Sequence, residues 1–242
     1  MAEIARVPTL YYAPRSLESF QCTVTPDWDR IVKEVGGART VADQNALDFL
    51  KSIRLTAQDT LNQGGSLDWK IQDNAIPPPD LASHLPRLQH GLEQAFQAFF
   101  ALWNAVVTGD IFSQPDDASG ITREASGWHT HEADSSQSID ETFDKDLFLT
   151  SMKTVDSNGT RVVKPQFADT PEGRIITSVE ITTTPPGSTA THTGRMTIGY
   201  ASIDGFRLPS SVAVSIAGLS LNFNLTHCTT VKARRSTAPS GP

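Results

Sequence analysis

The sequence is poor in cysteine, in charged residues and in long apolar runs, and each shortage excludes a class of protein. Its 242 residues include two cysteines, 19% charged residues and 7% aromatic residues. Two cysteines far apart form no Cys-x-x-Cys site. The net charge of −7 lacks the basic footprint of a nucleic-acid-binding protein. No apolar run approaches the roughly 20 residues of a membrane-spanning helix, so we expect no membrane span.

The two cysteines stand in the first and the last strand that we expect. Cys22 lies in an alternating segment over residues 17–25, and Cys228 lies in one over residues 219–231. A closed or nearly closed sheet would bring these strands together, and a disulfide would then join the two ends of the chain. Two buried free thiols, which behave as small hydrophobic groups, are the alternative. The first six residues have no apolar signal-peptide core, so the protein is either cytoplasmic or exported with its signal removed.

The last third of the chain predicts an antiparallel meander of long strands. Alternating runs cover residues 174–184, 190–203, 206–216 and 219–231. Asp204-Gly205 and Asn158-Gly159 each separate two such runs, and both dipeptides favour type I′ hairpin turns because both central residues of that turn need positive φ. Ala217-Gly218 marks a further turn. Hairpin after hairpin indicates one continuous antiparallel sheet.

The rest of the chain adds strands and three helices. We expect strands over residues 17–25, 52–61, 66–73, 124–133, 136–144, 147–155 and 160–168, and short helices from residue 26 and over residues 42–50. The predicted fold class is therefore α+β, a strongly curled, half-barrel-like antiparallel sheet wrapped around one long and two short helices. Residues 1–233 form a single domain, and residues 234–242 form a flexible tail.

The long helix, expected over residues 81–107 and beginning in earnest near Ser83, carries a continuous apolar stripe. Its positions recur in steps of three and four, the spacing of one helix face. The stripe is unusually aromatic at Phe96, Phe99, Phe100 and Trp103. We predict that these residues line a cavity for an apolar ligand, with Trp69 and Trp128 as opposing walls. A solid core is the alternative.

The most chemical-looking segment is Trp128-His129-Thr130-His131-Glu132. In a strand, His129 and His131 share a face, which can place both imidazoles on one metal ion. A third ligand would have to come from elsewhere, and two solvated histidines are the alternative. The sequence contains no Gly-x-Ser-x-Gly elbow and no Gly-rich phosphate loop. We therefore predict no catalytic residues and no cofactor.

The order of elements resembles the LolA/LolB-like superfamily of bacterial lipoprotein carriers and related envelope proteins, mainly over residues 125–231. The likeness rests on a hairpin of the form Tyr…Asp-Gly…Leu-Pro, on the strand pair over residues 212–226, and on the segment 143–148; the hairpin residues are Tyr200, Asp204, Gly205, Leu208 and Pro209. The resemblance implies a curled sheet with helices on its concave side, an exported protein and no catalytic residues.

These observations lead to three hypotheses. The first is a non-enzymatic periplasmic or secreted protein that binds a lipid or other apolar small molecule between helix and sheet. The second is a metal-binding protein or metal-dependent enzyme centred on His129 and His131. The third is an envelope scaffold with a solid core that pairs with a protein partner.

Overall fold

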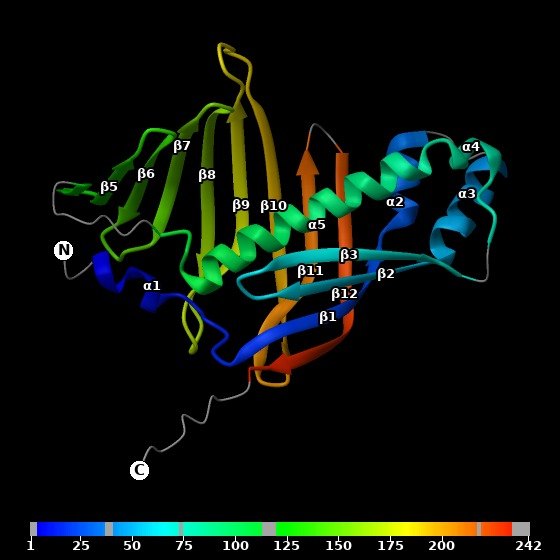
Figure 1. The fold of residues 1–242 in the computed structure, drawn as a ribbon, viewed down its shortest axis with the longest axis horizontal. Coiled ribbons are helices and arrows are strands. Elements are labelled where there is room, and N and C mark those ends of the chain that lie inside the picture. Colours follow the sequence, from blue (N-terminus) through cyan, green and yellow to red (C-terminus); the bar gives the residue numbers. More distant parts are fainter. Residues whose placement is uncertain (1–3, 37–40, 73–74, 113–119, 217–218, 234–242) are drawn as a thin grey trace.

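The computed structural model describes residues 4–36, 41–72, 75–112, 120–216 and 219–233 (Figure 1). The predicted turn at Ala217-Gly218 and the tail at residues 234–242 lie outside the described residues. The helical elements are η1 (Ile4–Arg6), α1 (Val7–Leu10), α2 (Trp28–Gly36), α3 (Val41–Ser52), α4 (Pro79–Ala82) and α5 (Leu85–Thr108). The protein is thus α+β, as the sequence predicts.

Twelve strands form one antiparallel sheet. They are β1 (Leu17–Pro26), β2 (Ile53–Thr60), β3 (Gly64–Ile71), β4 (Ile121–Glu124), β5 (Gly127–Ala133), β6 (Gln137–Asp144), β7 (Leu149–Asp156), β8 (Gly159–Ala168), β9 (Ile175–Thr184), β10 (His192–Ile203), β11 (Phe206–Ile216) and β12 (Leu219–Lys232). Their order in the sheet is β3-β2-β1-β12-β11-β10-β9-β8-β7-β6-β5-β4. Strands β9 to β12 form the predicted meander, the antiparallel pairing continues back from β9 to β4, and β12 pairs with β1. The sheet is not closed, because β3 and β4 are its two edges.

The first and last strands of the chain are neighbours inside this sheet, third and fourth from the β3 edge. In β1, Phe20, Cys22 and Val24 are buried while the residues between them are more exposed, as their alternation predicts. The register of β1 with β12 shifts between Gln21 and Thr23. At this irregularity Cys22 and Cys228 form a disulfide. Of the two alternatives for the cysteines, the structure has the bonded one.

Helix α5 lies across one face of the sheet and forms the centre of the core. In Figure 1 it crosses in front of β8 to β11, and β1 to β3 run across the direction of those strands. Phe96 packs edge-on against Phe223 of β12, and Trp103 packs edge-on against Phe20 of β1. Phe100 packs against Gly65 of β3, and its ring occupies the space that a side chain at position 65 would need. The helix therefore buries aromatic residues against several strands at once.

Three details of the expected elements are wrong. The strand expected over residues 124–133 is two strands, β4 and β5, joined by a tight turn in which Gly127 approaches the Phe143 carbonyl too closely for a Cβ atom. The long helix begins at Leu85, not near Ser83, and the preceding residues form the separate α4. Pro86 has no N–H to donate to the Ala82 carbonyl, so the two helices cannot merge.

The third correction concerns a turn type. Asp204 and Gly205 both have positive φ, 51° and 87°, as a type I′ turn requires. At the other predicted hairpin only Gly159 has positive φ, and the Asn158 N–H is held by the Asp156 carboxylate at 2.6 Å. The hairpin forms where expected, but it is not a type I′ turn. The Asp156 carboxylate favours a turn in which Gly159, the first residue after the loop, is the residue with positive φ.

Candidate functional site

The aromatic residues of α5 that were predicted to line a cavity lie buried in the core. Phe96, Phe99, Phe100 and Trp103 are each exposed by 2% or less. Their rings contact one another and Phe20 in edge-on and tilted geometries, with centroids 5.0–6.4 Å apart. The hollow beside Phe96 and Phe99 measures about 10 Å³, roughly the space of one water molecule. The space beside these rings is therefore too small for a lipid or another drug-sized molecule.

The two tryptophans predicted as walls lie on different strands. Trp69 on β3 is half-buried and packs edge-on against Trp28 of α2, with centroids 6.3 Å apart. Trp128 on β5 is half-buried under the Arg123 guanidinium, 5.1 Å from the ring centroid, and pairs in register with Phe143. The order of strands places β3 at one edge and β5 next to the other edge. The structure brings the four helix residues together, but it gives each tryptophan a separate partner.

A larger apolar hollow lies next to this core, between α5 and the strands β9 to β11. Its volume is about 270 Å³, and its lining is predominantly apolar: Ala95, Ala98, Ile181, Thr183, His192, Thr193, Gly194, Arg195, Met196 and Val214. Ala95 and Val214 also line the small hollow beside Phe96 and Phe99. The two spaces are therefore adjacent, and the larger one is called the apolar groove below.

The groove exists because small residues stand where α5 faces the sheet. Ala95 and Ala98 are the helix residues of its wall, and neither extends beyond Cβ. On the strands, Gly194 is the register partner of Ile181, so no side chain fills the space beside Ile181 on β10. Met196 and Val214 are register partners in the next row. Sequence reasoning missed this set because it sought large apolar residues, whereas a groove is made by small ones.

The histidine pair lies on the part of the sheet near β4. His131 Nδ1 lies 2.7 Å from the Asp140 Oδ1 atom, and His129 Nε2 lies 3.6 Å from the same atom. His129 and His131 thus share a face, as predicted, and Asp140 of β6 stands between them. Within the described part of the chain, no group of three or more His, Cys, Asp and Glu side chains is arranged to hold a metal. Metal binding by this pair stays a prediction, which elemental analysis of the protein and of His131→Ala tests.

Next to the histidines, a polar pair replaces apolar packing inside the sheet. Thr130 and Glu141 are both fully buried, and the Thr130 hydroxyl donates to the Glu141 carboxylate at 2.8 Å. The two residues are register partners on β5 and β6. The alternation that places the histidines on the outer face requires Thr130 to face inward. Glu141 satisfies the hydroxyl there, so this pair is part of the architecture of the strands.

A second buried polar pair joins β2 to α5. Asn104 Nδ2 donates to Asp59 Oδ1 at 2.9 Å, and Asp59 is completely buried. Burial raises the pKa of Asp59 to about 6, and the hydrogen bond from Asn104 opposes that rise only in part. Both residues occupy apolar positions in the periodicity of their elements. That mismatch was the available signal, and the sequence interpretation did not use it.

The comparisons with known proteins give no relative. Neither the family models, nor the curated proteins, nor the solved structures contain a match to this chain. Among the described residues, no helix is both long enough and apolar enough to cross a lipid bilayer. The candidate site must therefore be judged on its own geometry.

Proposed function

We propose that this is a non-enzymatic, exported protein that binds a lipid or another apolar molecule between α5 and the sheet. The observation that carries the proposal is the apolar groove of about 270 Å³ between Ala98 of α5 and Met196 of β10. Binding sites for small molecules are typically apolar hollows of about 300–1,000 Å³, and the groove lies close to the lower end of that range. An acyl chain suits a lining with few polar groups.

The proposal includes a sheet that curls around α5. Support comes from the contacts of the helix, since Phe96 meets Phe223 of β12 while Phe100 fills the space above Gly65 of β3. A sheet whose strands β3 and β12 both contact the same helix fits the curled shape expected from the resemblance to the LolA/LolB-like carriers. In that arrangement the groove is the open side of the interior, and Phe96 and Phe99 form its inner end.

Export is part of the same proposal. The disulfide between Cys22 and Cys228 is the supporting observation, because disulfides persist in the periplasm and outside the cell and are rare in the cytosol.

The test uses a filling substitution with a matched control. In Ala98→Phe the new ring should occupy the groove, whereas in Ala101→Phe the same ring stands one turn further along α5, away from the groove. Both positions are exposed, so neither change disturbs the core. We expect a fluorescent fatty acid to bind the native protein and Ala101→Phe alike, and to bind Ala98→Phe at least tenfold more weakly.

Two outcomes would contradict the proposal. Equal binding by both variants would place the ligand elsewhere. The scaffold with a solid core would be favoured if the native protein binds no fatty acid and if mass spectrometry gives the same mass under native and denaturing conditions, so that no ligand is bound.

A further inference from the structure

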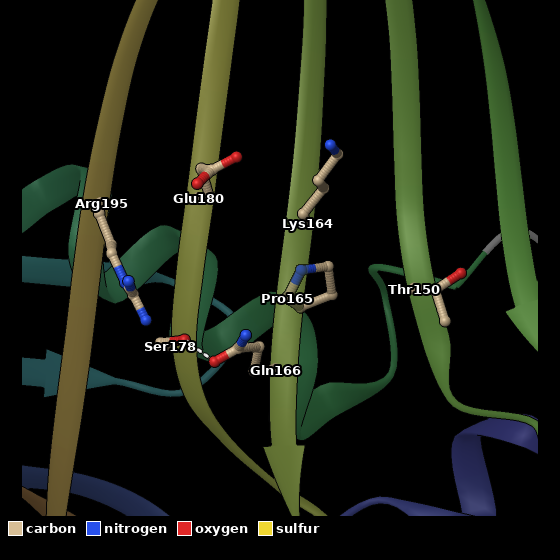
Figure 2. A pocket seen from close by; sticks show the side chains of 7 residues that line it. All are labelled: Thr150, Lys164, Pro165, Gln166, Ser178, Glu180 and Arg195. Atoms are coloured by element: carbon tan, nitrogen blue, oxygen red, sulfur yellow. Dashed lines mark hydrogen bonds between the residues drawn. The ribbon is translucent and has the colours of Figure 1, made fainter.

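The face of the sheet that points away from α5 carries a polar groove of about 320 Å³ over β7 to β10. Figure 2 shows the side chains that line it: Thr150, Lys164, Pro165, Gln166, Ser178, Glu180 and Arg195. The alternation along β8, β9 and β10 turns Val163, Val179 and Met196 toward the core. Lys164, Glu180 and Arg195, which follow or precede them by one residue, therefore stand on the outer face. Arg195 also lines the apolar groove, whereas Lys164, Gln166 and Glu180 do not.

The three charged residues form one row across three strands. Lys164 is the register partner of Glu180, and Glu180 is the register partner of Arg195. Opposite charges in such positions ordinarily attract each other. Among the described residues, however, no ion pair joins any two of the three. Their charges remain available to a ligand.

The directions of these side chains divide the groove into two ends. In Figure 2 the Arg195 guanidinium points toward Ser178 and Gln166, whereas the Glu180 carboxylate lies further along β9, level with Lys164. The Ser178 hydroxyl donates to Gln166 Oε1 at 2.7 Å. This bond fixes the amide and leaves its Nε2 group as the donor. One end thus offers a guanidinium and an amide N–H, which suit an oxyanion, and the other offers a carboxylate.

We propose that this groove binds a small zwitterion, with its oxyanion on Arg195 and Gln166 and its ammonium group on Glu180. Lys164 lies beside Glu180 and limits the negative charge at that end. A carboxylate and a phosphate present similar oxygens to a guanidinium, so an amino acid and a phosphoethanolamine group share the chemistry that the groove recognises. The two grooves share Arg195, but the proposal does not depend on the apolar groove, because Gln166, Glu180 and Lys164 line the polar groove and not the apolar one.

The surroundings allow a ligand larger than the two charged groups. Ser178 is the register partner of Thr197, and Thr197 lines a second polar hollow of about 480 Å³ over β10 to β12. That hollow includes the side chains of Ser211, Asn222 and Asn224. A polar remainder attached to the oxyanion would therefore meet hydroxyl and amide groups.

The experiment follows the amide signals of β8 to β10 by NMR while four probes are added to the native protein. O-phosphoethanolamine and β-alanine carry both charges, whereas inorganic phosphate and ethanolamine carry one each. We expect saturable shifts with at least one zwitterion, and at least tenfold weaker binding of inorganic phosphate and of ethanolamine. A preference for β-alanine would assign an amino-acid ligand, and a preference for O-phosphoethanolamine would assign a phosphate head group.

Variants then test the two ends. Arg195→Gln should weaken binding of the zwitterion at least tenfold. Glu180→Gln should reduce the affinity for O-phosphoethanolamine to that for inorganic phosphate. The control is Lys153→Gln, which removes an exposed cation of β7 on the same face, outside the groove, and should change nothing. Unchanged binding in Arg195→Gln, or phosphate binding as tightly as O-phosphoethanolamine, would overturn the proposal, as would the absence of any shift in the native protein.

Discussion

Cys22 and Cys228 are joined across the neighbouring strands β1 and β12 with their Cα atoms 4.1 Å apart, although 206 positions separate them in the chain. The bond therefore closes a loop that contains nearly the whole protein. Because the entropy lost by closing a loop grows with the logarithm of its length, a loop this long lies at the upper end of the stabilisation that disulfides give. The bond also joins the three-stranded part β1 to β3 to the nine-stranded part β4 to β12.

The first prediction concerns this bond. Replacing both cysteines, as Cys22→Ala with Cys228→Ala, should lower the free energy of unfolding by about 2–5 kcal/mol, because the unfolded chain regains its freedom. Urea unfolding of the native and doubly substituted proteins measures the difference. Reduced native protein should match the double variant. A difference below about 0.5 kcal/mol would mean that pairing of β1 with β12 alone fixes the two ends.

The second prediction concerns Asp59. Its pKa is about 6 in the folded protein, above the ordinary value near 4. The folded state therefore binds a proton more tightly than the unfolded state. The stability that the protonated form provides is complete below about pH 4 and is lost as the pH rises through 6. A pKa difference of two units between the folded and unfolded states corresponds to about 3 kcal/mol of folding free energy.

The variant Asp59→Asn should remove this loss. Its amide keeps the shape of the carboxyl and can donate to Asn104 Oδ1, an atom that has no partner among the described residues. We expect Asp59→Asn to be more stable than the native protein at pH 7.5 and similar to it at pH 4. Unfolding by urea at several pH values measures this. Asp68→Asn, at an exposed position of β3, should shift stability by less than about 0.5 kcal/mol at either pH.

The third prediction concerns the contact of β3 with α5. A Cβ atom at Gly65 would lie 2.7 Å from Phe100 Cβ and closer still to its ring. Gly65→Ala should therefore cost about 1–3 kcal/mol, because the fully buried ring cannot move aside without disturbing the core. At Gly91 of α5 no atom of the described residues lies within 4 Å of an added Cβ atom, so Gly91→Ala should stabilise the protein by up to about 1 kcal/mol. Thermal unfolding of both variants gives opposite signs if the packing is as described.

The fourth prediction concerns Arg174, which fastens the segment before β1. Its guanidinium lies 3.5 Å from the centroid of Phe148 and donates to the carbonyl oxygens of Leu147 and Asp146 at 2.9 and 2.7 Å. The Tyr11 hydroxyl accepts the Leu149 N–H at 3.0 Å in the same place.

Lysine cannot reproduce a planar group that stacks and donates twice, so Arg174→Lys should destabilise the protein by about 1–3 kcal/mol. It should also speed proteolysis before residue 17. The exposed Arg54→Lys serves as the control. Equal proteolysis of the two variants would show that the N-terminal segment is held by other contacts.

The strands were predictable because their cause is local. The alternation in β1 and the positive φ of Asp204 and Gly205 depend on a few adjacent residues, and both predictions are confirmed. Errors arose where a single contact decides the outcome. The Asp156 carboxylate changed the turn at Asn158, and the missing N–H of Pro86 separated α4 from α5. Neither contact alters the periodicity from which the elements were inferred.

The candidate site was less predictable. The apolar stripe of α5 identified which helix face is buried, and the sequence alone therefore determined the antiparallel meander, the long helix and its inward face. Only the tertiary structure decided that Phe96 to Trp103 fill the interior, that Ala98 and Gly194 leave a groove beside it, and that Arg195 is left without an ion pair next to Glu180. A hollow depends on what several distant segments fail to fill, and no periodicity along one segment records that.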